Sequence, residues 1–445
     1  MNTNKSSERA HSQTNTTKMK RIITILLLTI PILSVGQSSK MEYANRAYKK
    51  HLYETAVYLY KKVLKKRPNN KNTMKSIAEC YRLLDQWHDV EWSYGKLVLD
   101  AQKPNADDVL YYAQALQTNG KHEIAMDWFK LFMELDSNDR RGEAYMKSCL
   151  IDTIEKYNED FLDAFQLENI SFNSKKDDFS PVILPNGSLV FSQGKTGKVY
   201  NWYVPVYEPF SLDFIQVKLT SGLENTYTLA KKARKYRALS AASRATSLSV
   251  SYDEQQAIYM KYDRKECGKN HPNLIPFKLF TAQKQRSAWG YHLPFDYNMD
   301  EYTLTHPAFS EDGQRIYFSS DMPGGFGGMD LYYVSYEDGD WSAPKNLGAM
   351  INTKGDEVFP FIHYATGKFY FSSNGHGGMG GFDILWTSLS KQKTWVKPER
   401  FGAPINSRWN DYNIFINKDD NFGFISSDRK GGKGGVDVYS FQRLD

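Results

Sequence analysis

A twelve-residue glycine motif occurs three times in the sequence and constrains the fold more than any other feature. The pattern Ser-Ser-(Asp/Asn)-x-x-Gly-Gly-x-Gly-Gly-x-Asp begins at Ser319, Ser372 and Ser426. Copies that recur after 53 and 54 residues, without insertion or deletion, are typical of propellers and solenoids. Because glycine is unfavourable inside helices and strands, we expect the glycines to form a turn with positive φ.

Strand-like segments flank each glycine turn. In the first copy, residues 315–318 and 331–334 are rich in β-branched and aromatic residues, which favour strands. A second pattern, Trp-x-x-Pro followed by Ile-Asn-(Thr/Ser), repeats in the same register from Trp341 and Trp395. Each repeat thus predicts four short strands, the pattern of a propeller blade. The turn residues expected to have a structural role are Asp321, Gly324, Gly325, Asp330, Asn374, Gly377, Gly378, Asp383, Asp428, Gly431, Gly432 and Asp437.

Two degenerate copies lie upstream, at residues 188–194 and 257–263, so the sequence predicts five blades. The interval between these two copies is longer than the others and contains the basic, partly helix-prone residues 231–238. We expect these residues to form a solvated loop. The alternatives are a docking element for an acidic partner or an anionic surface, and a sixth, degenerate blade.

The ring is predicted to close by pairing the two ends of the propeller. The last strand-like segment, residues 436–441, ends close to Asp445, so the last blade is expected to lack its fourth strand. The missing segment has a counterpart at residues 172–181, which align without a gap to residues 351–360. A strand from the start of the propeller that completes the last blade removes two open sheet edges at once.

The first part of the sequence has a different composition, with many helix-forming residues and few glycines before residue 161. Small residues recur there after 34 and 35 positions, at Ala44, Ala78 and Ala113. This period is that of tetratricopeptide repeats, in which two antiparallel helices form each unit. We therefore predict three such repeats and a following helix at residues 142–157. A generic bundle of helical hairpins is the alternative.

Residues 1–36 have the pattern of a secretory signal peptide with an extended n-region. The basic residues 18–21 precede the apolar residues 22–33, and small residues stand at Ser34 and Gly36. This segment carries five Lys or Arg and one Glu, so only about +2 of the net charge of +6 belongs to the remainder. Such a balance gives no argument for binding nucleic acid. We expect a periplasmic protein.

Catalytic and metal-binding motifs are missing from the sequence. It has no nucleophile elbow, zinc-binding His pair, phosphate loop or Cys-x-x-Cys, and its three cysteines are scattered. Paired acids such as residues 356–357 recur once per blade, so we interpret them as structural. The aspartates that end the glycine motif are expected to accept hydrogen bonds from the N–H groups of their own turn. Calcium binding by these turns is the alternative. We expect neither enzymatic activity nor a cofactor.

The segment at residues 371–384, Phe-Ser-Ser-Asn-Gly-His-Gly-Gly-Met-Gly-Gly-Phe-Asp-Ile, resembles the TolB-type propeller repeat in its Bacteroidota form. A signal peptide (1–36), a tetratricopeptide domain (37–161) and a propeller (162–445), in this order, are similar to the PorE-like proteins of the type IX secretion and gliding machinery. Members usually continue into an OmpA-like domain that binds peptidoglycan. This sequence ends before such a domain, so peptidoglycan is not expected as a direct partner.

The resemblance implies a non-enzymatic scaffold in the periplasm, associated with the inner face of the outer membrane. Its partners would be other envelope proteins, such as outer-membrane or secretion-machinery components. The alternatives are a propeller that binds a glycan or a metal, and a propeller-fold lyase or glycosidase.

Tetratricopeptide arrays line a concave groove with the first helix of each repeat, and the resemblance carries this groove over to the present chain. The groove residues expected to bind a partner are Asn45, Tyr48, Lys75, Glu79, Arg82, Leu110, Gln114 and Gln117. Because the set is mostly polar and contains both charges, we expect an open surface that binds an extended peptide. An ordinary solvated helix face is the alternative.

Overall fold

The computed structural model describes residues 40–49, 52–155, 165–194, 212–221, 227–236, 239, 245–262, 277–286 and 288–444. Side chains are described for all of these except residues 151–155, 212, 221 and 262. Within this part of the chain, seven helices are followed by five β-sheets, which confirms the predicted helical array and five-bladed propeller. The predicted signal peptide and the predicted boundary between residues 161 and 162 lie outside the described residues.

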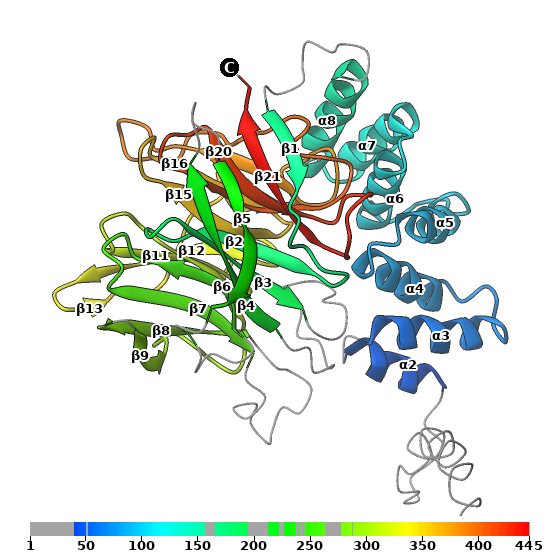
Figure 1. Cartoon of the computed structure of the whole chain (residues 1–445). Helices are drawn as coiled ribbons and strands as arrows, with labels where there is room; N and C mark the ends of the chain where they lie inside the picture. Colours follow the sequence, from blue (N-terminus) through cyan, green and yellow to red (C-terminus); the bar gives the residue numbers. More distant parts are fainter. Residues whose placement is uncertain are drawn as a thin grey trace, which may run out of the picture.

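The helices form three consecutive pairs and a final single helix, and each packs against the next along the chain. Figure 1 shows them as one array beside the propeller. The helices are α2 (Lys40–Lys49), α3 (Tyr53–Leu64), α4 (Lys71–Leu83), α5 (Trp87–Val98), α6 (Ala106–Thr118), α7 (His122–Leu135) and α8 (Arg141–Glu155).

Small residues allow the helices to approach closely. Ala44, Ala78 and Ala113, the residues that mark the predicted repeat, are completely buried between helices. Side-chain caps fix two helix starts, because Asn70 accepts a hydrogen bond from the N–H of Thr73 at 3.0 Å and Asn105 caps α6 in the same way. The packing agrees with three helical hairpins and a following helix, while their assignment as tetratricopeptide repeats stays a prediction.

The propeller contains five antiparallel sheets, which we number as blades in chain order. Blade 1 has β2 (Asp178–Ile183), β3 (Ser188–Gly194), β4 (Leu212–Ser221) and β5 (Tyr227–Lys235), and blade 2 has β6 (Ala245–Val250), β7 (Gln256–Tyr262), β8 (Phe277–Gln285) and β9 (Ala288–Pro294). Blade 3 has β10 (Leu304–Phe309), β11 (Arg315–Ser320), β12 (Asp330–Glu337), β13 (Asp340–Trp341) and β14 (Lys345–Asn346). Blade 4 has β15 (Glu357–His363), β16 (Lys368–Ser373), β17 (Asp383–Thr387) and β18 (Glu399–Arg400). Blade 5 has β19 (Asp411–Ile416), β20 (Phe422–Ser427) and β21 (Asp437–Arg443), together with β1 (Phe165–Asn169) from the start of the propeller.

The first strand of every blade lies innermost and contains a bulge. Its register against the second strand shifts at the same place in β2, β6, β10, β15 and β19. In four of the blades the bulged residue is not glycine and still has positive φ: Ser180 (52°), Ser247 (46°), His306 (49°) and Phe359 (54°). A bulge of this kind bends the strand and redirects a side chain.

The predicted closure of the ring is confirmed, with one refinement. β1 pairs antiparallel with β21 over five residues and becomes the fourth strand of blade 5. The aligned segment at residues 172–174 is not itself a strand. Its Asn173 fixes Val438 instead, accepting from the Val438 N–H at 3.0 Å and donating to its carbonyl at 2.6 Å. Asn352 and Asn406 bind Leu331 and Ile384 in the same way in blades 3 and 4.

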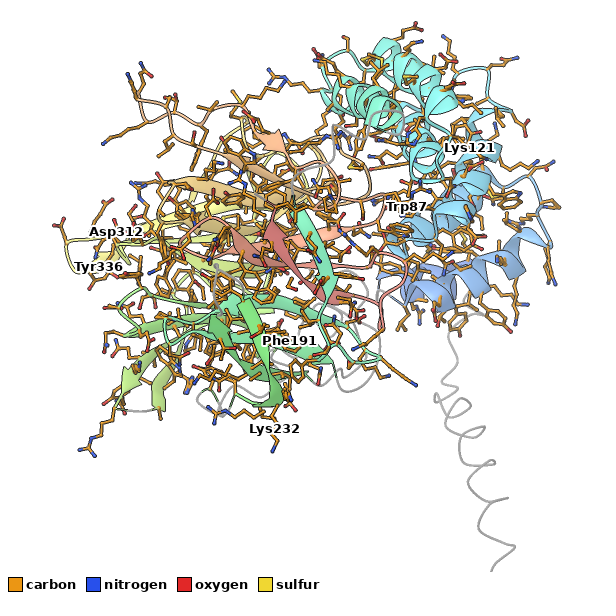
Figure 2. All side chains as sticks on the ribbon, turned by 45° about the horizontal axis from the view of Figure 1, so that its top comes forward. Trp87, Lys121, Phe191, Lys232, Asp312 and Tyr336 are labelled. Carbon is orange, nitrogen blue, oxygen red and sulfur yellow. The ribbon has the colours of Figure 1, made fainter. Side chains whose placement is uncertain are left out.

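Residues 231–235 of the basic segment 231–238 form part of a strand, which corrects the expected loop. Residues 231–235 belong to β5, the outer strand of blade 1, and they are exposed. Figure 2 shows Lys232 projecting from this edge of the propeller. The sheet that follows is blade 2, so the segment does not hide a sixth blade. Charged side chains on an outer strand discourage pairing with other chains.

Candidate functional site at the junction of the array and the propeller

The first glycine of each motif adopts the left-handed backbone that the sequence predicts. Its φ is 96° at Gly324, 76° at Gly377 and 101° at Gly431. The expectation was wrong for the other glycines of the motif, whose φ values lie outside the left-handed region. They are required by close contacts. A Cβ on Gly378 would overlap with the carboxylate of Asp383 in its own turn. Gly325 and Gly432 stand in the same relation to Asp330 and Asp437.

The third glycine of the motif brings neighbouring blades together. A Cβ on Gly380 would overlap with the carbonyl oxygen of Trp409, which belongs to the segment that enters blade 5. Gly327 and Gly434 meet the backbone at residues 353–355 and at Lys176 in the same manner. The turns are therefore contact points of the ring, and their glycines are fixed by space.

The aspartate that ends each motif accepts hydrogen bonds from its own turn, as predicted. Asp383 accepts from the N–H of Met379 at 3.1 Å and from that of Gly380 at 3.2 Å. Asp330 and Asp437 accept from the two equivalent N–H groups of their turns. Among the described residues, no group of three or more His, Cys, Asp or Glu side chains is placed to hold a metal ion.

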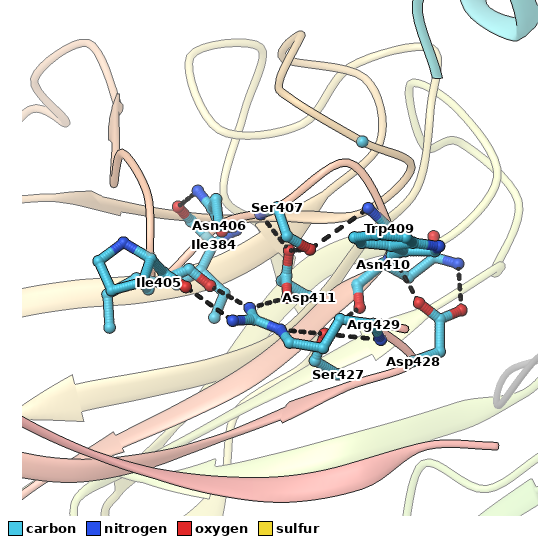
Figure 3. A network of polar contacts seen from close by, with 12 residues as sticks. Ile384, Ile405, Asn406, Ser407, Trp409, Asn410, Asp411, Ser427, Asp428 and Arg429 are labelled. Carbon is cyan, nitrogen blue, oxygen red and sulfur yellow. Dashed lines mark hydrogen bonds and ion pairs between the residues drawn. The ribbon is translucent and has the colours of Figure 1, made fainter. Parts of the chain in front are cut away.

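A polar network continues from these turns into the next blade (Figure 3). Asn410 accepts from the N–H of Phe382 at 2.9 Å and donates to Asp428 at 2.8 Å. Beside it, Asp411 forms an ion pair with Arg429 at 2.5 Å. The buried carboxyl groups of Asp411 and Asp428 thus each have a specific hydrogen-bond donor, as buried polar groups require.

Glu357 takes the place of Asp411 in blade 4, but no arginine accompanies it. Its carboxyl accepts from the hydroxyls of Thr353 and Ser373 and from the Thr353 N–H, each at 2.7 Å. The residue that aligns with Arg429 is Gly375. Complete burial without a cation raises the pKa of Glu357 to about 8, with neighbouring Asp356 adding to the rise.

The raised pKa of Glu357 predicts that the protein loses stability as the pH rises. From about pH 4.5 to about 8, the folded state holds a proton that the unfolded chain has already released. The free energy of unfolding therefore falls with increasing pH across this window, by roughly 1–4 kcal/mol for this group. Urea unfolding at pH 5, 6.5 and 8 measures the slope. Glu357→Gln mimics the protonated side chain and is expected to flatten it, whereas an unchanged slope would contradict the assignment.

The glycine turn of blade 4 and the segment that enters this blade meet the helical array. Gln117 at the end of α6 donates to the carbonyl of Gly378 at 2.7 Å, and Tyr145 in α8 donates to the carbonyl of Asn374. Lys354 lies 3.1 Å from both Asp136 and Asp139 in the loop before α8. We call these contacts the junction. In Figure 1 the array accordingly lies along one face of the propeller.

The predicted groove residues divide into three sets. Asn45 and Lys75 are exposed, and Tyr48 is half-buried, in the part of the groove before the junction. Lys75 forms an ion pair with Asp108 at 2.8 Å, and Asn45 accepts from the hydroxyl of Tyr60 at 2.8 Å. These three residues are placed where a partner has access, and their role in binding stays a prediction.

The second set does not form the open surface that was expected. Gln117 is 2% exposed against the propeller, and Leu110 is buried in the core of the array. Gln114 lines a cavity inside the junction. The protein's own glycine turn in blade 4 thus takes up the end of the groove where an extended peptide was expected.

Glu79 and Arg82 form a partly buried network within the array. Arg82 donates to both carboxylate oxygens of Glu79, and the hydroxyl of Tyr94 donates to Glu79 at 3.0 Å. The Arg82 guanidinium also lies 4.6 Å from the ring centre of Tyr111. Although burial alone would raise it, the charge and hydrogen bonds of Arg82 lower the pKa of Glu79. This pair connects α4 with α5 and α6, so its first role is structural.

The junction encloses a polar cavity of about 240 Å³. Arg82, Trp87 and Gln114 line it from the array, and Asp356 and Asn410 line it from the propeller. Trp87 lies on the side of the array that faces the propeller (Figure 2). Since positive, negative and amide groups all line it, the cavity has no preference for a ligand of one charge.

A second and larger cavity opens on the opposite face of the propeller. It has a volume of about 600 Å³ and is lined by the bulged first strands of all five blades. Its rim consists of the hairpins that join the first and second strands, including residues Tyr252 and Tyr364. We call this cavity the funnel. The glycine turns join the second and third strands, so the funnel and the array lie at opposite ends of the ring.

Two further observations concern the described residues. The thiols of Cys80 and Cys149 are buried inside the array and form no disulfide, while Cys267 lies outside the described part of the chain. None of the described helices combines the length and the apolar character needed to cross a lipid bilayer.

Comparison with known proteins gives no family assignment. No protein-family model matches the chain. No curated protein matches its sequence.

Several solved structures share part of the fold at low similarity. TolB from Acinetobacter baumannii is 11% identical with a TM-score of 0.32, covering 68% of this chain and 69% of that one. Putative TolB from Agrobacterium tumefaciens is 12% identical with a TM-score of 0.31, and the match covers 63% of this chain and 98% of that one. An alpha-L-arabinofuranosidase from Lactobacillus brevis is 13% identical with a TM-score of 0.37, and the match covers 61% of this chain and 92% of that one. TM-scores this low support no inference about function.

Proposed function

We propose that the protein is a non-enzymatic scaffold of the bacterial periplasm that connects other envelope proteins. The signal-peptide pattern of residues 1–36 supports the compartment. The resemblance to PorE-like proteins supports a role in type IX secretion, gliding or related envelope assembly. In this proposal the partner binds the part of the groove before the junction, at Asn45, Tyr48 and Lys75.

The junction is the observation that carries the proposal. It fixes the array against the propeller through Gln117, Tyr145 and Lys354, which come from separate places along the chain. Two binding surfaces, the open part of the groove and the face of the propeller away from the array, are thereby held at a fixed spacing. Rigid placement of two surfaces is what an adaptor requires.

The chemistry of the funnel favours a scaffold over a glycosidase. Hydrolysis of a glycosidic bond ordinarily uses two carboxyl groups that face each other across the substrate. Among the described residues that line the funnel, Asp419 at the rim is the only carboxylate. It accepts a hydrogen bond from the hydroxyl of Tyr227 at 3.2 Å.

Site-specific crosslinking in cells tests this function. A photoreactive amino acid is placed at Asn45 or Lys75 in the groove, and at Tyr58, which is 58% exposed on α3, as the control. We expect the two groove positions, and not Tyr58, to capture the same envelope protein. Changing Asn45 and Lys75 together to Ala is then expected to weaken binding of that purified protein at least tenfold. Lys75 is half exposed, but Asp108 is buried and loses its ion-pair partner in this variant, so unfolding of the variant is measured alongside binding.

The proposal is contradicted by either of two results. Capture of the same proteins from Tyr58 would indicate non-specific contact. Undiminished binding by the double variant would exclude the groove as the docking site.

A further inference from the structure

The funnel has the size and the composition of a small-molecule site. Its volume of about 600 Å³ lies within the range of ligand pockets, roughly 300–1,000 Å³. Proline and aromatic residues form much of its wall, including Pro307, Pro360, Phe361 and Phe415. At the rim, the rings of Tyr252 and Tyr364 meet edge to face at 5.7 Å, and Tyr252 is 63% exposed.

The wall of the funnel carries almost no charge. Among the described lining residues, Lys418 and Asp419 are charged, and they stand next to each other in the hairpin after β19. The lining histidine His363 already has two partners, the hydroxyl of Thr366 at 2.8 Å and the carbonyl of Asn417 at 2.7 Å. An ionic ligand would lose its hydration here without gaining a buried counter-charge. The wall therefore selects for an uncharged ligand.

His306 contributes an unsatisfied polar group to the funnel. Its side chain is 2% exposed, and neither Nδ1 nor Nε2 has a hydrogen-bond partner. The imidazole packs on the ring of Phe359, with 3.7 Å between the ring centres. Burial lowers the pKa of His306 to about 3, so the ring is neutral and offers one donor and one acceptor. Burying such a group without a partner is unfavourable by about 1–3 kcal/mol.

Backbone strain is concentrated around the same histidine. His306, Phe359, Ser180 and Ser247 occupy equivalent bulges and all have φ near 50°. Left-handed backbone at non-glycine residues is unfavourable and is found preferentially at ligand clamps and active sites. The bulges recur around the ring and place these four residues at one level of the funnel, beside the unsatisfied imidazole of His306.

We propose that the funnel binds a small, uncharged aromatic compound that carries a hydroxyl group, and that this hydroxyl pairs with the imidazole of His306. The aromatic body packs against the proline and aromatic wall. The hydroxyl donates to the unprotonated nitrogen of the neutral ring or accepts from the protonated one, so it pairs with one of the two vacant nitrogens. To reach them, the ligand takes the place of the contact between His306 and Phe359.

Two probes of similar shape test the proposal, p-cresol with a hydroxyl and toluene without one. In a dry apolar pocket toluene binds more tightly, because the hydroxyl of p-cresol loses its water partners. If His306 receives the hydroxyl, the order reverses, and we expect p-cresol to bind at least fivefold more tightly. Ligand-detected NMR titrations of the whole protein give both dissociation constants.

His306→Phe is the variant that removes the imidazole with the least change of backbone. Phe359 shows that phenylalanine adopts a φ of 54° in the equivalent bulge of blade 4. We expect the variant to bind toluene within about twofold of the wild type and to lose the preference for p-cresol. His306→Asn, which tolerates left-handed backbone and keeps a donor and an acceptor, is expected to retain part of the preference.

Three results would overturn the proposal. They are tighter binding of toluene by the wild type, a preference for p-cresol that persists in His306→Phe, and failure of both probes to bind. A third probe, N-acetyl-tyrosinamide, tests whether the funnel instead binds a tyrosine side chain of a polypeptide. Binding at least a hundredfold tighter than that of p-cresol would assign the funnel to a tyrosine side chain of a partner polypeptide instead.

Discussion

Replacing Gly380 by valine is expected to destabilise the protein by at least about 3 kcal/mol. The new Cβ would overlap with the carbonyl oxygen of Trp409 and lie 2.7 Å from that of Ser407. Both obstacles are backbone atoms of the neighbouring blade, so relief requires that the two blades separate. Overpacking against side chains alone typically costs about 1–3 kcal/mol. Denaturant unfolding of the variant measures the loss.

Gly194→Val is the matched control for Gly380→Val. Gly194 belongs to the degenerate upstream copy, where a Cβ would lie 3.3 Å from the carbonyl oxygen of Asp177 and from the Cβ of Lys176. A shift of a few tenths of an ångström accommodates these contacts, so we expect a loss of about 1 kcal/mol or less. Equal losses at the two positions would contradict the view that the motif glycines are fixed by contact between blades.

Deleting residues 437–445 is expected to abolish cooperative unfolding of the propeller. The deletion removes β21, which pairs with β20 on one side and β1 on the other. It also removes Val438, the residue that Asn173 binds. Blade 5 would then present unpaired strands, and the open edges favour aggregation. Calorimetry and light scattering measure both effects. A truncated protein that melts like the wild type would contradict closure by β1.

Single substitutions measure the strength of the closure without removing a strand. Asn173→Ala leaves the backbone N–H of Val438 without a partner and removes one of the two hydrogen bonds to its carbonyl, which keeps the N–H of Ile170. This is expected to cost about 1–3 kcal/mol. Asn406→Ala does the same to Ile384 within blade 4. If β1 and Asn173 hold blade 5 as strongly as Asn406 holds blade 4, the two variants lose the same free energy of unfolding. A much smaller loss for Asn173 would show that the ring closes loosely.

The repeated part of the fold was predictable because each signal occurs several times. The glycine motif predicted the strands on both sides of each turn, and the aligned Asn173 indicated how the ring closes. The reason for the glycines was predicted only in part. Positive φ is a property of one residue, as at Gly377, whereas the contact of Gly380 with Trp409 depends on how two blades pack.

The junction could not be predicted from the sequence. No sequence pattern around Gln117 tells whether it faces the propeller or an external partner, because amide side chains are common in contacts of both kinds. The funnel did leave a signal that was missed. A residue followed by proline recurs at the same point of three blades, as Ser180-Pro181, His306-Pro307 and Phe359-Pro360. These dipeptides mark the bulges that line the cavity.

The closure by β1 also determines when the protein acquires its structure during synthesis. Asn169 and Asp437, which are hydrogen-bonded at the closure, lie 268 positions apart in the chain. At ordinary ribosomal rates, the interval between their appearance is roughly 15–50 s. Throughout this time β1 has no partner, while the helices of the array have already been made. The array can therefore receive the turn at Gly378 as soon as blade 4 emerges, before the ring is complete. In this order of events β21, the last strand to be synthesised, completes the ring.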